Sequence, residues 1–483
     1  MRGHDFGGVW IGLILGGCTV LPGMALAEES ASVRLDRAWQ SFHAGLAEAR
    51  DRLENREDFP PEPSDRNLAE GYRYLLGHVV RMAEAELRLD PRFPEFHRSV
   101  DMLRKHTGEN PDAMYLKAPI DGTGSYRIRG RVADTREWRS SERHASGPKA
   151  PRLVTFQTIT DIPGNTGELA EMGQCASQTL GFVNSFEIEP DASGEFEIRI
   201  GPKRPKGYDG LFLPSRKQLA CAANQTSAVR DAKYVAVREI FSDWEHERPL
   251  ELEIERLDSV GASRPPITPE QMAEILERLA VHVPNHIRFW SLLQEFPLEV
   301  RRDANGDGVR NLPVNGMNEA RPPFTAGGAA GSKQLYASGV FELAPDQALV
   351  IRVETPKEPH YIGFQLNNFW MEGPDQQNYT SSRTGQQLPP ASDGARYYVV
   401  SHRDPGVPGW VATTGLPKGF HTLRLVYRDD PDPADLPTIT THLGPVDRVS
   451  DQLPDDTPVV TVEARRAEVA VRQAHIKQRW RAY

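Results

Sequence analysis

The chain has 483 residues, more than one hydrophobic core usually serves, so we expect two or three domains. Hydrophobic residues make up 39% and charged residues 26%, which is a globular composition. The formal net charge of −10 argues against a nucleic-acid partner, because phosphate binding needs clustered Lys and Arg.

The first segment has the pattern of an export signal. Residues 9–21 form an apolar run that is too short to span a bilayer comfortably. The small residues Ala25-Leu26-Ala27 follow as a cleavage site. We therefore expect a signal peptide over 1–27, a mature chain without a membrane span, and a periplasmic or secreted location. The alternatives are lipoprotein processing at Cys18 and an uncleaved membrane anchor.

Two cysteines, Cys175 and Cys221, remain after the predicted cleavage. A pair of cysteines in an exported protein is often a disulfide, and this is our prediction. The alternative is two separately buried thiols. No Cys-x-x-Cys pattern occurs, so thiol redox chemistry and a cysteine-rich zinc site are not supported.

Residues 28–119 are predicted to form a helical layer. Leucines and aromatic residues recur at helical spacing over 33–55, and a second helix follows Ser64-Asp65. This helix ends before Asp90-Pro91, since the residue before a proline avoids the helical region. We expect a third, short helix over 95–105.

From Tyr126 onward the hydrophobic period changes to two, which is typical of β-strands. Charged and apolar residues alternate, so one face of the sheet is predicted to be covered and the other wet. We assign residues 120–258 to an antiparallel β-domain with strands over 126–132, 153–159, 186–188, 196–200, 234–241 and 250–257.

Residues 259–332 predict one helix followed by a long loop. Thr268 and Gln271 have the spacing of a capping box at the start of the helix. Pro284 is expected to end or kink it. The Gly- and Pro-rich passage that follows reads as a loop or linker.

Residues 333–460 predict a second β-rich domain, and residues 461–483 a terminal helix. The predicted strands cover 335–343, 348–353, 361–367, 396–402, 421–427 and 438–442. The helix carries many arginines. We expect it to dock on the core, and contact with anionic lipid is the alternative.

Two patterns bear on metals, and neither predicts a site. Asp303-x-Asn305-x-Asp307-Gly308 matches the first half of a calcium loop, but Val314 stands where a bidentate Glu is needed. An ordinary polar turn is the favoured interpretation. His360, His402 and His421 lie near strand ends, but no two share the spacing of metal ligands.

The stretch from His360 to Trp410 holds the candidate binding site. Ile362, Phe364 and Leu366 alternate with polar residues, so one face of this strand is apolar and the other polar. Amides and aromatic rings on a sheet face suit a neutral polar ligand. The predicted ligand-binding residues are Tyr361, Gln365, Asn367, Trp370, His402 and Trp410. The alternative is that the polar face is a contact between domains.

Catalytic motifs are sparse. The sequence has no Gly-x-Ser-x-Gly elbow, phosphate-binding Gly-rich loop or His-Glu-x-x-His helix, and we predict no cofactor. For an enzyme, His402 with Asp404 or Asp393 would be the candidate catalytic set. Both aspartates stand beside Gly or Pro, where Asp is an ordinary turn former.

Several motifs of this region occur together in one bacterial family. They are Tyr361-Ile-Gly-Phe-Gln-Leu-Asn-Asn-Phe-Trp370, Tyr379-Thr-Ser381, Gln386-Gln387, Asp393-Gly394 and Val399-Val-Ser-His-Arg-Asp-Pro-Gly-Val-Pro-Gly-Trp410. Over 335–428 the chain resembles the family called domain of unknown function 1214, with weaker echoes such as Asn110-Pro-Asp-Ala-Met-Tyr115. The resemblance implies a β-sandwich or jelly-roll-like C-terminal domain and no established activity. Gly409 departs from the family pattern, which has Asn before this Trp.

We therefore predict an α+β chain that is mainly β. An N-terminal helical layer and an antiparallel β-domain precede a C-terminal β-sandwich or jelly-roll-like domain. The leading function is an exported binding or accessory protein for a small neutral or carbohydrate-like ligand. The alternatives are a hydrolase- or lyase-type enzyme that uses the C-terminal domain, and an envelope structural or interaction module.

Overall fold

The computed structural model describes residues 29–54, 64–140, 143–144, 147–174, 177–220, 227–295, 312–322 and 334–481. Four predictions lie outside these residues: the signal peptide over 1–27, processing at Cys18, the Cys175–Cys221 disulfide and the calcium loop at Asp303–Asp307. They stay predictions.

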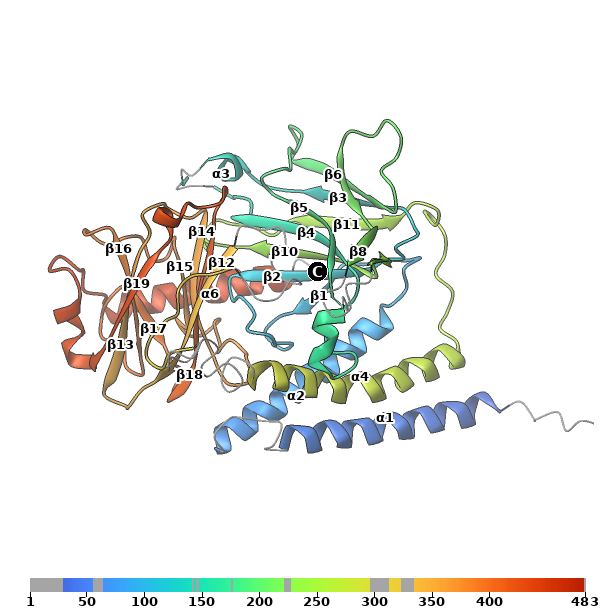
Figure 1. The fold of residues 1–483 in the computed structure, drawn as a ribbon, viewed down its shortest axis with the longest axis horizontal. Coiled ribbons are helices and arrows are strands. Elements are labelled where there is room, and N and C mark those ends of the chain that lie inside the picture. Colours follow the sequence, from blue (N-terminus) through green and yellow to red (C-terminus); the bar gives the residue numbers. More distant parts are fainter. Residues whose placement is uncertain are drawn as a thin grey trace, which may run out of the picture.

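Two β-rich regions stand side by side in the molecule (Figure 1). The first, the β-domain, pairs a five-stranded sheet in the order β1-β2-β10-β4-β5 with a four-stranded sheet in the order β11-β3-β6-β7. Buried side chains from both sheets, such as Phe156 and Ile198, form the core between them. The strands are β1 (His97–Val100), β2 (Ala113–Pro119), β3 (Tyr126–Arg131), β4 (Leu153–Ile159), β5 (Thr179–Asn184), β6 (Glu195–Gly201), β7 (Leu211–Pro214), β10 (Tyr234–Ile240) and β11 (Glu251–Arg256).

Both faces of the five-stranded sheet are covered. Along β2, Leu116 and Ala118 face the core between the sheets, so Tyr115 and Lys117 face the other way. The prediction of a wet face is therefore wrong for this sheet, because other parts of the chain pack over it. It holds for the four-stranded sheet, where the side chain of Glu251 is 79% exposed.

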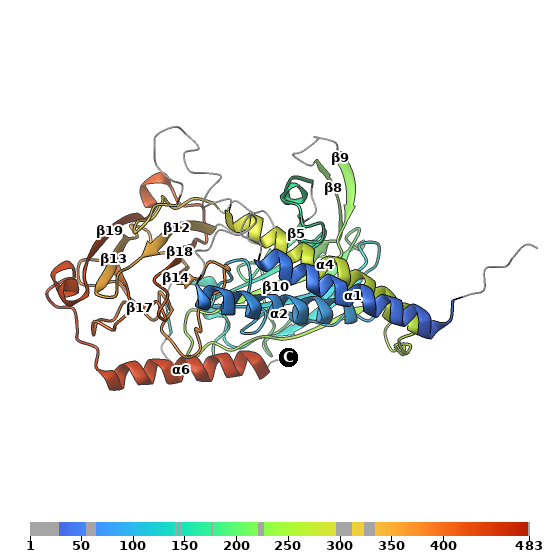
Figure 2. The ribbon, with the colours of Figure 1, turned by 90° about the horizontal axis from the view of Figure 1, so that it is seen from below.

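Three helices form a layer on the outer face of the five-stranded sheet, as Figures 1 and 2 show. They are α1 (Ala31–Glu54), α2 (Asp65–Leu87) and α4 (Pro269–Glu295). Their buried side chains pack with Ile159 and Tyr234 of the sheet. Helices α1 and α4 approach closely at Gly45. A Cβ at this position would lie 2.4 Å from the carbonyl oxygen of Ala280, so the contact requires a glycine.

The predicted helix starts are confirmed. The Ser64 hydroxyl accepts a 3.1 Å hydrogen bond from the backbone N–H of Asn67. Thr268 and Gln271 exchange the two bonds of a capping box, at 3.0 and 3.2 Å. The prediction was that Pro284 ends or kinks this helix. Helix α4 continues past Pro284, so the proline does not end it, and a kink there stays a prediction. Packing of the buried α4 face outweighs a penalty of about 3 kcal/mol for an internal proline.

The prediction of a helix over 95–105 is also wrong. This segment contains β1, which pairs antiparallel with β2 so that His97 lies opposite Lys117. The free edge of β2 offers backbone partners, and such tertiary pairing overrides local propensity. Strands β1 and β2 pair in one sheet with β10, β4 and β5, so the β-domain begins before the predicted boundary at 120. Residues 186–188 lie in a turn and the loop after it, where we predicted a strand.

The second β-rich region is a sandwich of two four-stranded sheets, in the orders β12-β18-β14-β15 and β17-β16-β13-β19. Side chains such as Phe364 from one sheet and Tyr398 from the other form its core, with ring centroids 4.6 Å apart. The strands are β12 (Gln334–Glu342), β13 (Gln347–Glu354), β14 (Tyr361–Asn367), β15 (Ser382–Thr384), β16 (Ala395–Ser401), β17 (Trp410–Ala412), β18 (Lys418–Val426) and β19 (Thr438–Pro445). The predicted α+β, mainly β fold class is confirmed.

The terminal helix α6 (Val462–Arg481) runs from the sandwich to the β-domain (Figure 2). Three arginines spaced seven residues apart, Arg465, Arg472 and Arg479, are buried along it. The predicted docking on the core is therefore confirmed. No helix within the described ranges is both long and apolar enough to cross a bilayer. The remaining elements are α3 (Arg136–Arg139), the hairpin of β8 (Arg216–Ala220) and β9 (Ser227–Asp231), and the 3-10 turns η1 (Leu169–Gln174), η3 (Pro433–Asp435) and η4 (Val446–Gln452).

Candidate ligand-binding site

The polar face of β14 packs against the β-domain. Gln365 and Asn367 are 2% and 3% exposed. The Gln365 amide donates 2.7 Å bonds to the Glu109 carbonyl and to the Asn367 side chain, and its oxygen accepts from Arg424. The Tyr361 hydroxyl donates a 2.6 Å bond to Asp112. The alternative interpretation, a contact between domains, describes this face.

Trp370 is part of the helical layer's core. Its indole N–H donates a 2.9 Å bond to the carbonyl of Asn67 in α2. Its ring lies 5.4 Å from that of Tyr74, and it comes so close to Gly71 that a Cβ there would lie 2.4 Å from the ring. This tryptophan anchors the sandwich to α2.

The other predicted site residues lie on the sheet of β16 and β17, away from β14. His402 has a Thr413 hydroxyl 2.7 Å from Nδ1 and the Leu343 carbonyl 3.3 Å from Nε2. Arg465 of α6 binds Asp404 at 2.9 Å and covers the ring of Trp410 at 5.1 Å.

Asp393 lies at the turn before β16 and accepts bonds from Arg352 and Tyr397, at 2.9 and 2.8 Å. Gln365 and Asn367 are thus brought together, whereas the six predicted ligand-binding residues do not gather around one cavity. The three catalytic candidates have partners of their own.

The three histidines of the metal hypothesis are also apart. His360 Nε2 lies 2.7 Å from the carbonyl of Arg152, and His421 Nε2 lies 2.8 Å from that of Gly316. In the part of the chain that the structure describes, no group of three or more His, Cys, Asp or Glu side chains could hold a metal ion.

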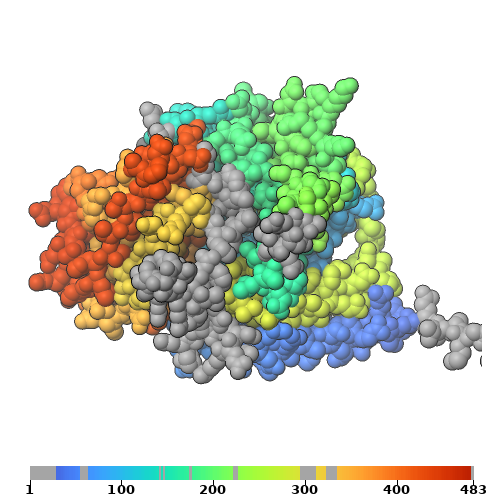
Figure 3. Space-filling view, viewed as in Figure 1, coloured from blue at the N-terminus to red at the C-terminus, as the bar shows by residue number. Residues whose placement is uncertain are grey.

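A cavity of about 490 Å³ lies where the β-domain, the helical layer and the sandwich meet. We call it the junction cavity. Its floor is the outer face of the five-stranded sheet, with Tyr115, Lys117 and Arg238. Arg81 of α2 and Arg424 of β18 belong to its other walls. Surfaces of all three parts are visible on the face of the molecule shown in Figure 3. The volume is in the range of small-molecule sites.

Among the described lining residues of the junction cavity, basic side chains outnumber acidic ones. Three arginines and one lysine line it, Arg81, Arg238, Arg424 and Lys117, whereas Glu109 is the one carboxylate among the described lining residues. Burial raises the pKa of Glu109, and the charge of Lys105 opposes that shift. Much of the remaining lining is apolar and comes from Leu153, Ile159, Ile162, Phe182, Ile240 and Leu293.

Two histidines hold Arg81 in place. Its guanidinium donates to Nδ1 of His78 at 3.0 Å and to Nδ1 of His286 at 2.9 Å. Because a guanidinium only donates, both rings carry their proton on Nε2, and that of His286 is bonded to Asn165 at 3.0 Å. Burial holds the pKa of both histidines well below the usual value, so the rings are neutral. At these two contacts the guanidinium of Arg81 is bonded to neutral rings, and its positive charge is not balanced by a carboxylate.

Four buried polar atoms of the described lining residues have no hydrogen-bond partner. They are the Thr155 hydroxyl on the sheet floor, Oε2 of Glu109, Nε of Arg81 and the indole Nε1 of Trp290. The other oxygen of Glu109 accepts a 2.7 Å bond from the Gly373 N–H. Buried polar atoms are normally paired, so all four atoms are candidates for contact with a ligand or with ordered water.

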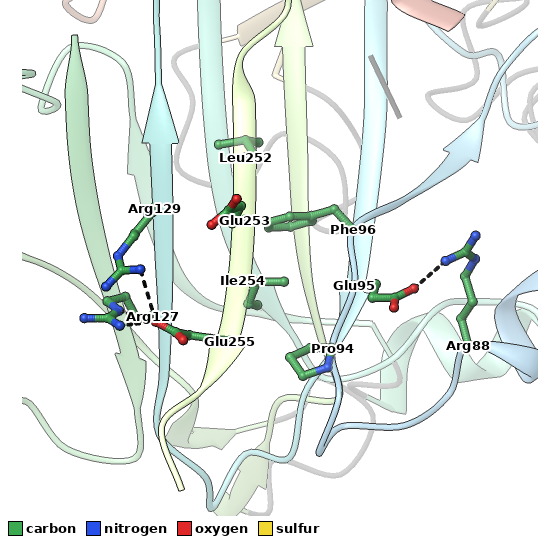
Figure 4. Close-up of a pocket in the computed structure, with 10 residues that line it drawn as sticks. All are labelled: Arg88, Pro94, Glu95, Phe96, Arg127, Arg129, Leu252, Glu253, Ile254 and Glu255. Atoms are coloured by element: carbon green, nitrogen blue, oxygen red, sulfur yellow. Dashed lines mark hydrogen bonds and ion pairs between the residues drawn. The ribbon is translucent and has the colours of Figure 1, made fainter. Parts of the chain in front are cut away.

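A second hollow, of about 480 Å³, lies at the β11 edge of the four-stranded sheet, beside residues 94–96 (Figure 4). All three arginines of this hollow pair with carboxylates. Arg88 binds Glu95 at 2.7 Å, and Arg127 and Arg129 both reach Glu255. Glu253 adds a further negative charge. This surface therefore offers no unpaired cation among its described residues to bind an anion, and the junction cavity is the stronger candidate.

The cavity residues were missed from the sequence because they are far apart in it. One local signal was present: Lys117 stands in the otherwise apolar strand sequence Ala-Met-Tyr-Leu-Lys-Ala-Pro of β2. A lysine on a strand that is buried on both faces is unusual. Recognising it required knowing that the second face is covered.

The fold and the cavity define a two-domain α+β protein with a ligand-sized space between its domains. No family model matches the chain, and no curated protein matches it. The chain is similar to the crystal structure of an uncharacterized protein from Burkholderia cenocepacia, with a TM-score of 0.67 and 23% identity over 86% of this chain and 99% of that chain. A protein from Vibrio parahaemolyticus aligns with a TM-score of 0.37 and 12% identity, over 77% of this chain and 98% of that chain. The Burkholderia protein shares the fold.

Proposed function

We propose that this protein binds a small organic anion, with an apolar body and a carboxylate, in the junction cavity. The observation that carries the proposal is the lining of three arginines, one lysine and a single carboxylate among the described residues, in a largely apolar space. Buried cations are costly unless an anion pairs with them, and charge-assisted bonds to a carboxylate are strong. An apolar body would displace water from the remaining walls.

This proposal keeps the predicted binding function and changes the ligand. A neutral, carbohydrate-like ligand was expected on the polar face of β14, but Gln365 there is bonded to Glu109 and Arg424. The enzyme alternative relied on His402, whose ring nitrogens face Thr413 and Leu343. Those contacts favour a structural role for both sets of residues.

We also propose that the chain is an exported relative of domain of unknown function 1214. The Ala25-Leu26-Ala27 site and the motifs between Tyr361 and Trp410 support this. The intact mass of protein recovered from the periplasm or medium tests the export proposal. A mature chain that starts near Glu28 is expected, and a lipid on Cys18 would replace it with the lipoprotein alternative.

Thermal unfolding of the full chain with octanoate and benzoate tests the ligand proposal. Both acids are expected to raise the unfolding midpoint in a concentration-dependent way, because ligand binding to the folded state stabilises it by mass action. Octanamide and benzamide have nearly the same shape without the charge and should have little effect. Equal shifts with acids and amides would contradict anion recognition.

A matched pair of variants locates the site. Arg238→Met should weaken benzoate binding by about tenfold or more, since one charge-assisted bond contributes roughly 1.5–3 kcal/mol. Arg129→Met, on the outer face of the four-stranded sheet with a 55% exposed side chain, should bind benzoate like wild type. Wild-type affinity in Arg238→Met would move the site elsewhere.

A further inference from the structure

The junction cavity contains an amine whose surroundings differ from those of other buried lysines. Lys105, Lys117 and Lys149 are 3%, 4% and 2% exposed. Lys105 donates to two backbone carbonyls and to Gln376 Oε1. Lys149 pairs with Glu137 and Asp243 at 3.1 and 2.9 Å. Both of these amines donate hydrogen bonds to oxygen atoms.

Lys117 has no such oxygen partner among the described residues, and its amine lies 5.1 Å from the centre of the Tyr234 ring. The neighbours across the sheet are His97 on β1 and Ala236 on β10, and Ala236 also lines the cavity. The small side chain of Ala236 leaves space beside the amine. Lys117 therefore borders an open, ligand-sized space from a strand that is paired on both edges.

The electrostatic surroundings leave a large share of this amine uncharged at neutral pH. Burial, together with the charge of Arg81, lowers the pKa of Lys117 to about 7. Asp161 acts in the opposite direction, but its carboxylate is 2.5 Å from the amine of Lys233. The titratable or charged groups around Lys117 are Arg81 from α2, His97 from β1, Tyr234 from β10, His106 from the loop before β2, and Asp161 after β4.

The two neighbouring histidines add no positive charge. Burial lowers the pKa of His97 to about 3 and holds that of His106 well below its usual value. A desolvated lysine beside a fixed cation is the arrangement that makes an amine nucleophilic, because the lone pair is free and weakly hydrated.

We infer that Lys117 forms an imine with the carbonyl group of an organic acid bound in the junction cavity, a 2-oxo acid or an aldehyde acid. This inference rests on the proposed function, since the cationic side chains of the cavity hold the carboxylate. The Nζ lone pair forms a bond to the carbonyl carbon while the C=O π electrons move to oxygen. One N–H proton passes to that oxygen and gives a neutral carbinolamine. The second N–H proton then passes to the same oxygen, the C–O bond breaks, and water leaves as the C=N bond forms. The step is a condensation, so it requires no oxidant or reductant.

Borohydride trapping of the full chain tests the inference. The protein is incubated with 4-formylbenzoate or phenylpyruvate, reduced with sodium borohydride, and analysed by intact mass and peptide mapping. At pH 7 the peptide containing Lys117 should be modified at least about tenfold faster than peptides with exposed lysines, because far more of its amine is uncharged. The rate of trapping at Lys117 should rise to half its maximum near pH 7.

Variants and a separate readout keep the two proposals distinct. Lys117→Met should lose the trapped adduct, whereas Lys233→Met, whose lysine side chain is 65% exposed, should keep it. Mapping of the wild-type protein needs no variant and decides the matter if Lys117→Met fails to fold. Adducts spread evenly over surface lysines would overturn the inference. If benzoate still raises the unfolding midpoint in that case, the anion site stands and only the imine chemistry fails.

Discussion

Tyr361 shows how a residue predicted to bind a ligand serves instead to join two domains. Its hydroxyl donates to Asp112 at 2.6 Å and accepts from Asn110 at 2.9 Å, and all three side chains are buried. Burial raises the pKa of Asp112 to about 6, and the bond from Tyr361 opposes that shift. The tyrosine therefore satisfies a carboxyl group that water cannot reach.

The substitution Tyr361→Phe should lower the free energy of unfolding by about 1–3 kcal/mol, since it leaves the buried carboxyl group of Asp112 without this donor. Chemical denaturation measures the loss, and benzoate binding should not change. Tyr379→Phe is the control, because Tyr379 is 48% exposed. A Tyr361→Phe protein of wild-type stability with weakened ligand binding would restore the original site hypothesis.

Helix α6 acts as an element that ties the sandwich to the β-domain. Arg472 donates to the carbonyls of Gln376 and Ser382 in the sandwich and lies 4.9 Å above the ring of Trp244 in the β-domain. One helical repeat of seven residues later, Arg479 donates to the Pro111 carbonyl at 2.7 Å. Each arginine therefore satisfies backbone oxygens that are buried between the domains.

Replacing one of these arginines should destabilise the whole chain. Arg472→Leu is expected to cost about 3 kcal/mol, because buried carbonyl oxygens lose a charged donor. Arg466→Leu, on the exposed side of the same helix, should leave the unfolding midpoint unchanged within error. Equal effects of the two substitutions would contradict the tying role of the buried face.

Elements with a clear period or a capping signature could be predicted, and short edge strands could not. The alternation along β14 and the capping box at Thr268 each specify their element from neighbouring residues alone. Strands β1, β15 and β17 are three or four residues long and exist because a partner strand offers its edge. The junction cavity could not be predicted from the sequence for the same reason, because Lys117 and Arg424 come together only after both domains have folded.

Across the whole molecule, burial sets two opposing pH dependences. Buried histidines have lowered pKa values, so the unfolded chain binds protons below about pH 6.5 that the folded chain does not, and stability falls as the pH falls. Buried Glu239 and Glu247 have pKa values raised to about 8 by burial. The stability that these two protonated carboxyl groups contribute to the folded state is lost as the pH rises from about 4.5 to 8. The histidines concerned are His78, His97, His106, His286, His360, His421 and His475.

The unfolding midpoint should therefore be highest near pH 6.5 and decrease towards both pH 5 and pH 8. Glu239→Gln should flatten the alkaline side by up to about 1.4 kcal/mol per pH unit, because one titrating group is removed. Glu251→Gln, which replaces an exposed carboxyl group, should leave the profile unchanged. An unaltered alkaline slope in Glu239→Gln would show that this carboxyl group is ionised in the folded protein.

The junction cavity has walls from three parts of the chain: Arg81 from a helix, Lys117 from the β-domain and Arg424 from the sandwich. Neither β-rich region alone contains all of its walls. Separate expression of either β-rich region would give a surface instead of a pocket, and fusing one region to a foreign partner would not transfer binding. A bound ligand would touch all three parts at once and slow their separation. The site therefore exists only when all three parts of the chain are present and folded together.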